Sequence, residues 1–357
     1  MAYTSIDDPT LYFNTKLYTG NGSTQSITGV GFQPDWLWIK SRGFSSNHNL
    51  FDAVRGTDKL IFSNLTNAEV DGGTILSSFD TDGFTLGVGD DSNRNSDTFV
   101  AWNWLASNTT ASNTDGSITS TVSANTTSGF SIVSYDGEGS AGDTVGHGLG
   151  TVPKMMIFKR LETADNWTVY HSSIGATKRL RLNTTDAEQT SSSFFNDTEP
   201  TSSVFTLGSN NEVNGSAEGY IAYCFAEKQG YSKFGSYTGN GNADGTFIYT
   251  GFKPAFLMIK KSSASGTNWI MKDNKRSGTS ALQDFGQMNP NQTENPSANL
   301  SNAENKASAF AIDILSNGFK LRGTDTGINN SGDTYIYIAI AESPFVTGAS
   351  GIPTTAR

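Results

Sequence analysis

Cysteine and histidine are the residues that this chain has least of. Among its 357 residues there is one cysteine, Cys224, and there are three histidines, His48, His147 and His171. A single cysteine excludes an intramolecular disulfide, so the fold must be held by packing, as in a protein assembled in a reducing cytoplasm. No metal-ligand spacing of His or Cys is present, so the sequence indicates neither a zinc site nor a histidine-based catalytic centre.

Charged residues and long apolar runs are also scarce. Only 16% of the residues are charged, and the formal net charge is −10. This negative balance repels phosphate, which disfavours binding to nucleic acid or to an anionic membrane surface. No apolar stretch approaches the length of a membrane span. The first residues contain no basic region followed by an apolar run, so we expect no secretory signal.

Glycine and aromatic residues, in contrast, are abundant. The chain has 38 glycines, and 11% of its residues are aromatic. Glycine, together with the many Asn, Ser and Thr residues, favours tight turns, and the aromatic residues supply apolar area for a packed core. Many turns combined with few Leu, Ala, Lys and Glu residues predict strands rather than helices.

Five landmarks recur in the same order three times along the chain. The first is a glycine-rich turn after a tyrosine, at Tyr18, Tyr135 and Tyr237, as in Tyr18-Thr-Gly-Asn-Gly-Ser. The second is a proline followed by an apolar run that ends in lysine: Pro34 to Lys40, Pro153 to Lys159, and Pro254 to Lys260. The third ends in Ala-Glu, at Glu69, Glu188 and Glu304.

The last two landmarks complete the unit. The fourth resembles Gly83-Phe-Thr-Leu-Gly87 and recurs from Val204 and from Gly318. The fifth is an apolar closing segment that starts at Thr98, Gly219 and Thr334. Five landmarks at near-constant spacing indicate three divergent copies of one unit of about a hundred residues.

The landmarks divide the chain into segments. We assign a docking arm to residues 1–12, and repeats to residues 13–107, 129–228 and 229–345, with a C-terminal tail at 346–357. Residues 108–128 are rich in Ser, Thr and Asn, so they form either a flexible linker or an added strand of the second repeat. The short junction between the second and third repeats predicts that these two pack directly against each other.

Each repeat has the pattern of a β-sandwich. The closing segment and the proline-to-lysine run are apolar on both alternating faces, as in central strands that are covered on both sides. Glycine- and asparagine-rich clusters separate the runs at hairpin-like intervals. We therefore predict an all-β chain of three tandem antiparallel β-sandwich domains.

The candidate catalytic groups do not form a pattern. The histidines occupy different places in the three units, and His147 is predicted to lie at a loop tip between two glycines. The glutamates of the third landmark have no shared second acid nearby, as a glycosidase would need, so we expect them to be structural. Cys224 lies in an apolar strand and is predicted to be an inert buried thiol. We accordingly expect no enzyme, no cofactor and no catalytic residue.

Two loops contain clustered oxygen ligands. Residues 90–97 and 325–333 are rich in Asp and Asn, and the second copy has Asn210, Asn211, Glu212 and Asn214 at the same place. Such clusters suit Ca²⁺. The same residue types are also selected by hairpin turns, so the sequence leaves both a calcium site and a plain turn open.

These landmarks, with the opening segment from Thr4 to Thr15 and the junction from Gly230 to Gly241, resemble a repeat family of tailed bacteriophages, especially marine ones. Its members are mostly uncharacterised and are often labelled as tail fibres or other virion proteins. The resemblance covers essentially the whole chain and implies a virion component assembled in the host cytoplasm. It transfers no catalytic or ligand-binding residue.

On this basis we expect a structural protein on the virion surface, either a short tail fibre for host adsorption or a head decoration protein. The chain lacks the coiled-coil or β-helical shaft sequence of long fibres. The alternatives are a glycan-binding adhesin and a polysaccharide depolymerase. Expected partners are other virion proteins, which residues 1–12 would contact, a host glycan, and further copies of the chain in a trimer, the last by analogy alone.

Overall fold

The computed structural model describes residues 3–276 and 308–346. In these residues the regular structure is almost entirely strand, and the helices are single turns. The paired strands of the sheets are antiparallel, and the sheets pack face to face. The predicted all-β fold of antiparallel sandwiches is therefore confirmed. Residues 299–304 with Glu304, and residues 347–357 of the tail, lie outside the described residues.

Repeat 1 has a larger sheet in the order β1-β9-β3-β4-β5-β6 and a smaller one in the order β2-β8-β7. Its first and last strands are therefore neighbours. Its elements are η1 (Pro9–Leu11), β1 (Phe13–Thr19), β2 (Gln25–Thr28), β3 (Trp36–Ser41), β4 (Asn49–Asp52), β5 (Gly56–Phe62), β6 (Val70–Asp71), β7 (Leu76–Asp80), β8 (Gly83–Leu86), α1 (Asp90–Asn93) and β9 (Thr98–Trp104).

Repeat 2 repeats this order as β12-β19-β14-β15-β16-β17, with β13 and β18 in the smaller sheet. Residues 108–128 add the strands β10 and β11 beside β12, so they join the sheet of repeat 2. Its elements are β10 (Ala111–Asn113), β11 (Ser120–Asn125), β12 (Phe130–Asp136), β13 (Thr144–Gly146), β14 (Pro153–Arg160), β15 (Thr168–His171), β16 (Lys178–Arg181), β17 (Gln189–Thr190), α2 (Ser192–Phe195), β18 (Val204–Thr206), α3 (Asn211–Asn214) and β19 (Gly219–Ala226).

Repeat 3 again places its closing strand between its first strand and its proline strand, in the order β20-β26-β22-β23. Its smaller sheet has the order β21-β25-β24. Its elements are β20 (Ser232–Thr238), β21 (Phe247–Tyr249), β22 (Phe252–Lys261), β23 (Ile270–Asp273), η2 (Ser308–Phe310), β24 (Ile312–Leu315), β25 (Gly318–Leu321) and β26 (Thr334–Pro344).

The two apolar faces of the proline strands have different partners. In β3, Leu37 and Ile39 point into the sandwich of repeat 1, whereas Trp36 and Trp38 point into a core that contains residues from all three repeats. β14 and β22 alternate in the same way. Successive side chains of a strand point to opposite faces. Each larger sheet therefore packs against the smaller sheet of its own repeat on one side and against the shared core on the other.

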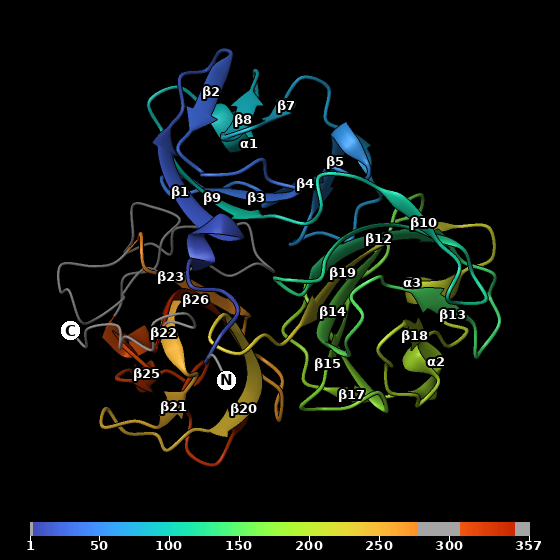
Figure 1. Cartoon of the computed structure of the whole chain (residues 1–357). Coiled ribbons are helices and arrows are strands. Elements are labelled where there is room, and N and C mark those ends of the chain that lie inside the picture. The colour runs from blue at the N-terminus through green and yellow to red at the C-terminus, as the bar shows by residue number, and fades with distance from the viewer. Residues whose placement is uncertain (1–2, 277–307, 347–357) are drawn as a thin grey trace.

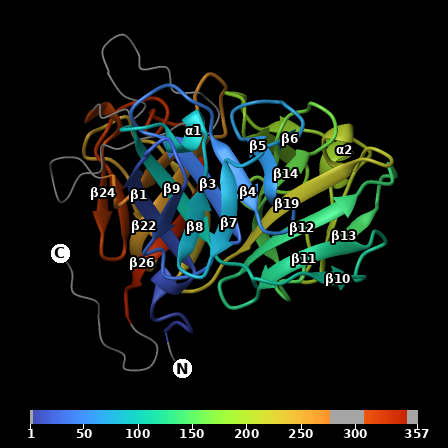
Figure 2. The same ribbon diagram turned by 90° about the horizontal axis from the view of Figure 1, so that it is seen from above.

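The shared core places the three repeats around a common centre, as Figure 1 shows. Figure 2 gives the view from above, with repeats 3 and 2 on either side of repeat 1. Trp36 of repeat 1 stacks on Tyr223 of repeat 2, with ring centroids 4.3 Å apart. Phe256 of repeat 3 lies 5.7 Å from Trp104 of repeat 1. The repeats thus form a closed ring rather than the predicted string, and repeats 1 and 3 are in contact.

Polar bonds between the repeats follow the same three-fold pattern. The Trp102 indole of β9 donates to Asp273 of β23 at 3.0 Å, and the Tyr223 hydroxyl of β19 donates to Asp52 of β4 at 2.8 Å. At the third, equivalent position the pair is Ile338 and His171. There His171 Nε2 donates instead to the Tyr337 carbonyl oxygen at 3.2 Å.

The residues beside this position change together with it. Asp52 and Asp273 are each paired with an arginine three residues later, at 2.6 Å and 2.5 Å respectively. In repeat 2, where His171 replaces the aspartate, Ile174 stands at the arginine position. A buried carboxylate needs both an opposite charge and hydrogen bonds, so loss of the acid removes the need for both partners.

The lysine that ends each proline run is buried and bonds to the loop that follows it. Lys159 Nζ donates to the carbonyl oxygens of Asp165, at 3.0 Å, and of Thr66 in repeat 1, at 3.4 Å. Lys260 Nζ donates to the Thr267 carbonyl oxygen at 2.5 Å. Burial lowers the pKa of each of these two lysines to about 8. The repeated lysine therefore anchors a loop and, in repeat 2, also contacts repeat 1.

The N-terminal arm packs on its own chain. Ile6 is buried in the shared core, Tyr12 makes an edge contact with Tyr231 at 6.0 Å, and the Tyr3 hydroxyl donates to the Gly251 carbonyl oxygen at 2.7 Å. Residues 3–12 therefore lie on repeat 3, where they help to close the ring. The arm that we expected to reach another virion protein is already engaged within the chain.

Replacing Trp36 with alanine should lower the free energy of unfolding by about 3–5 kcal/mol, the usual cost of emptying a large aromatic site. Because the core is shared, we expect all three repeats to unfold in one transition. Urea unfolding, followed by tryptophan fluorescence and by circular dichroism, measures the free energy of unfolding and shows the number of transitions. Val88→Ala, at a side chain 67% exposed, is the control. Separate transitions in the two signals would contradict a shared core.

His171 should make the ring sensitive to acid. Burial lowers its pKa from 6.5 to about 4 in the folded state, so between these pH values the unfolded chain binds a proton that the folded chain does not. Its contribution is therefore fully present above pH 6.5 and is lost as the pH falls toward 4, by about 3 kcal/mol in total. Unfolding free energies of the wild type and of His171→Gln across this range give the test. Equal pH dependence in the two proteins would show that His171 is not responsible.

Candidate functional site

Aromatic and polar side chains line a hollow between the N-terminal arm and repeat 3, which we call the arm hollow. Its volume is about 310 Å³. Glu227 and Gln229 of the turn between β19 and β20 contribute one wall, together with Lys233 at the start of β20. Tyr249 of β21 contributes another wall, and Tyr3 comes from the arm. The N-terminal arm thus meets two neighbouring segments of the chain from which it is more than two hundred residues away.

Two glycines allow the arm to approach repeat 3 this closely. Gly251 has φ +82°, and a Cβ atom there would lie 2.6 Å from the Tyr3 hydroxyl oxygen. Gly230 has φ +77°, and its Cβ atom would lie 2.8 Å from Cβ of Thr4. Positive φ and the close approach both favour glycine at these positions. The arm and the wall of the hollow are therefore held in one arrangement.

The charges in the arm hollow balance each other. Glu227 pairs with Lys233 at 2.7 Å and also accepts a hydrogen bond from the Phe234 amide at 3.3 Å. Burial, followed by a hydrogen bond and charge interaction with Tyr249, raises the pKa of Tyr3 to about 12, so its phenol is neutral at pH 7. The site offers donors and acceptors of both kinds, which suits a polar ligand without net charge.

Strand β21 carries two outward aromatic rings next to this hollow. Phe247 is 43% exposed and Tyr249 is 54% exposed, while Ile248 between them is buried. β21 is an edge strand of its sheet, since it pairs only with β25 there. At the same register, repeat 1 has Ser26 and Thr28, and repeat 2 has Thr144 and Gly146. The outward rings are thus specific to repeat 3.

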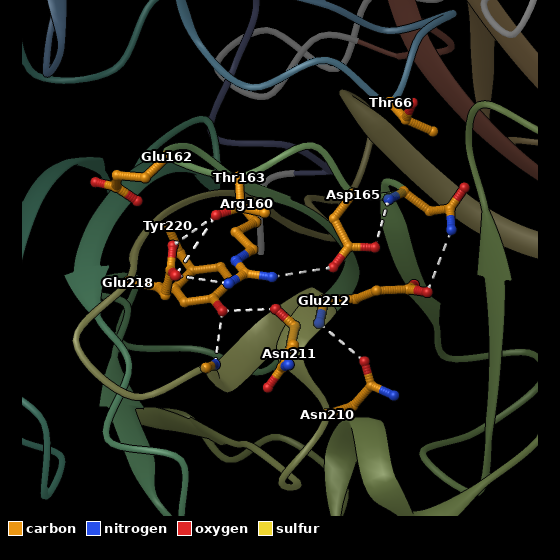
Figure 3. A network of polar contacts seen from close by, with 12 residues as sticks. Thr66, Arg160, Glu162, Thr163, Asp165, Asn210, Asn211, Glu212, Glu218 and Tyr220 are labelled. Atoms are coloured by element: carbon orange, nitrogen blue, oxygen red, sulfur yellow. Dashed lines mark hydrogen bonds and ion pairs between the residues drawn. The ribbon is translucent and has the colours of Figure 1, made fainter.

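A second polar cluster lies in repeat 2 near its junction with repeat 1 (Figure 3). Arg160 pairs with Glu218 at 2.6 Å and with Asp165 at 3.5 Å. Nearby, Glu212 pairs with Arg181 and accepts a hydrogen bond from Thr168 at 2.8 Å. Burial by itself would raise the pKa of Glu212, but these bonds and the charges of neighbouring arginines outweigh it and lower the pKa. The cluster is internally paired and orders the loops of this repeat.

The Asp- and Asn-rich loops of the three repeats each contain one buried asparagine: Asn93, Asn214 or Asn329. Asn93 donates to the carbonyl oxygens of Ser23, at 2.6 Å, and of Gly87, at 2.8 Å, and accepts from the Asn21 amide at 3.0 Å. Asn214 and Asn329 make the same kind of bonds in repeats 2 and 3. This asparagine joins the glycine-rich turn of the first landmark to the loop after the fourth.

The landmark tyrosine supports the same corner. The hydroxyls of Tyr18, Tyr135 and Tyr237 donate to the carbonyl oxygen of the residue just before the buried asparagine, at 2.6–2.8 Å. Each of these rings also stacks on the first aromatic residue of the closing strand, at 5.0–5.2 Å. The first, fourth and fifth landmarks are therefore held together in every repeat, which explains why their spacing is kept.

The described residues contain no group of three or more His, Cys, Asp or Glu side chains arranged to hold a metal ion. In loops 90–97 and 325–333, the buried asparagine oxygens accept from backbone amides. Calcium binding by these loops therefore stays an untested alternative to a plain turn. No helix in the described part of the chain is long and apolar enough to cross a membrane.

The histidines are buried in the protein. The prediction that His147 lies at a loop tip is wrong: it is fully buried, and its ring nitrogens bond the Thr201 carbonyl and the Leu149 amide, each at 3.2 Å. His48 accepts from the Trp38 indole at 2.9 Å. His171 accepts from the Ser173 amide at 3.1 Å, besides its bond to repeat 3. These bonds fix ring orientation within the fold.

The remaining candidates also have places in the fold. Glu69 pairs with Arg55 at 2.9 Å, and its amide donates to Leu161 of repeat 2. Glu188 pairs with Lys178 at 2.5 Å, and its amide donates to Ser262 of repeat 3. Both repeated glutamates therefore lie at junctions between repeats. Cys224 is buried, as predicted, and burial raises the pKa of its thiol.

Sequence reasoning missed the arm hollow, because Tyr3, Glu227 and Tyr249 belong to three different segments. One signal was available. When the repeats are aligned on their fourth landmark, Phe247 and Tyr249 replace the small residues of repeats 1 and 2. Aromatic rings at positions where the other two repeats have Ser, Thr or Gly are not needed for the repeated fold, so they indicate a property of repeat 3 alone.

Asn93→Asp distinguishes a structural asparagine from a calcium ligand. The new carboxylate would face the two carbonyl oxygens to which Asn93 now donates, so we expect the variant to lose about 2–4 kcal/mol of stability. Asn95→Asp, which adds the same charge at an exposed position of this loop, is the control. Melting temperatures are measured with calcium and with a chelator. Calcium rescue of Asn93→Asp alone would support the metal site instead.

Comparison with known proteins gives a family without an assigned activity. Residues 8–344 match the model described as Domain of unknown function (DUF7483). No curated protein matches the chain. The matched region contains all three repeats, in agreement with a ring that shares one core. The chain therefore belongs to the DUF7483 family of domains of unknown function.

Proposed function

We propose that this protein is a structural component of the surface of a tailed bacteriophage particle, acting as a short tail fibre or host-adsorption protein. The resemblance of its landmarks to phage repeat proteins motivates the proposal. The observation that carries it furthest is the closed ring with one shared aromatic core. A body of this kind is rigid without disulfides, as a protein assembled in a reducing cytoplasm and then used outside the cell must be.

A binding or structural role fits the polar residues better than catalysis does. The bonds of His147 and His171 go to backbone groups, and Glu69, Glu188 and Glu212 are paired with arginine or lysine. A general base must be able to reach a substrate proton, and these groups are held inside the fold. We therefore propose that the chain is not an enzyme and needs no cofactor.

A head decoration protein is the second candidate, and the three-fold arrangement of the repeats favours it. Shells built with closed symmetry have three-fold positions, and a ring of three similar units can make similar contacts with three neighbours there. In either role the partners are other virion proteins. The three repeats already form, within one chain, the three-fold arrangement that was expected between three chains. Assembly of the chain into a homotrimer stays a separate prediction.

Immunogold labelling of intact particles with an antibody against the chain tests the proposal. We use the phage whose genome encodes the chain, and a pre-immune serum is the control. Label at the tail end is the expected result, and even label over the head would favour the decoration role. Particles without label, with the chain recovered only from the soluble lysate, would overturn both.

A further inference from the structure

We propose that the arm hollow and the two outward rings of β21 together bind a neutral saccharide, as part of a glycan on the host surface. This inference rests on the proposed adsorption function and names the ligand class and the site. The evidence is the combination of two exposed aromatic rings, a hollow with balanced charges, and the absence of these rings from the same positions of repeats 1 and 2.

The rings supply flat apolar surface where none is needed for folding. Phe247 and Tyr249 are two residues apart in one strand, so their side chains leave the same face of the sheet about 7 Å apart. Aromatic rings stack well on the apolar faces of sugar rings, and tyrosine also offers a hydroxyl. The same face carries Ser26 and Thr28 in repeat 1, which shows that the strand forms without aromatic residues.

The polar groups of the hollow match the hydroxyls of a sugar. Glu227 offers acceptor oxygens, Lys233 offers donors, and Gln229 offers both. Because Glu227 and Lys233 pair with each other at 2.7 Å, an anionic or a cationic ligand would bring a like charge to one of them. A ligand that is neutral but rich in hydroxyl groups can bond to both without this cost.

The size and rigidity of the site agree with this ligand class. A volume of about 310 Å³ is at the lower end of the range for ligand pockets, so it suits one or two sugar rings rather than a large cofactor. Tyr3 is held by its bond to Gly251, and the close approach at Gly230 fixes the arm beside it. A site that is already ordered loses little conformational entropy when it binds.

Phe247→Ser combined with Tyr249→Thr tests the inference. This double variant of the full chain introduces the residues that repeat 1 has at the same register, so we expect it to fold. Val88→Ser, an exposed position in repeat 1, is the matched control. Gln229→Ala is a second variant, in the opposite wall of the hollow. Binding is measured on a printed array of neutral and acidic glycans, and then by calorimetry with the neutral oligosaccharide that binds best.

We expect the wild type and Val88→Ser to bind the same neutral glycans. The double variant and Gln229→Ala should each bind at least about tenfold more weakly, a loss of about 1.4 kcal/mol. No bound glycan, binding to acidic glycans only, or equal affinity in the double variant would overturn the inference. Immunogold labelling does not depend on these rings. A chain found on the particle that binds no glycan would therefore overturn this site and leave the proposed function standing.

Discussion

The whole structure depends on one constraint: each larger sheet is apolar on both faces, and its own sandwich can cover only one of them. The second face of repeat 1 carries Trp36, Trp38, Trp102 and Trp104, and all four side chains are buried against the other repeats. Exposing such a surface to water would cost far more than a folded domain can usually spare. Each repeat is therefore a unit of the sequence, but it does not form a domain that folds independently of the others.

The hydrogen bonds at the junctions fix the positions of the three repeats relative to one another. A buried core of stacked rings tolerates small rotations, whereas a buried carboxylate must meet its donor within hydrogen-bond distance. Asp52 and Asp273 each take one such bond from the neighbouring repeat. At the third junction the aspartate, the arginine and the ring donor are all replaced, and His171 keeps a bond to repeat 3. The exchange of the complete set shows that the three positions act as one unit.

Much of the fold could be predicted from the sequence, because the landmarks are local. Alternation of apolar residues identified β3, β14 and β22 as strands covered on both sides, and the glycine-rich clusters marked their turns. The ring could not be predicted in this way, since its closure depends on contacts such as the hydrogen bond from Tyr3 to the Gly251 carbonyl oxygen, 248 residues away. The same reason hid the arm hollow, whose walls come together only when the ring closes. His147 was misplaced because flanking glycines are as compatible with a buried strand end as with an exposed turn.

The neighbouring first and last strands of each repeat have a consequence for how such a chain can arise. Since β1 lies beside β9, β12 beside β19, and β20 beside β26, every repeat starts and finishes in the same part of its own sheet. A duplicated gene segment that encodes one repeat can then be inserted without changing the path of the chain in the repeats on either side. For the same reason, the junction between repeats 3 and 1, which is held by noncovalent contacts alone, is equivalent to the two that are crossed by the chain. The order of the repeats along the polypeptide could be permuted circularly while the ring keeps its geometry.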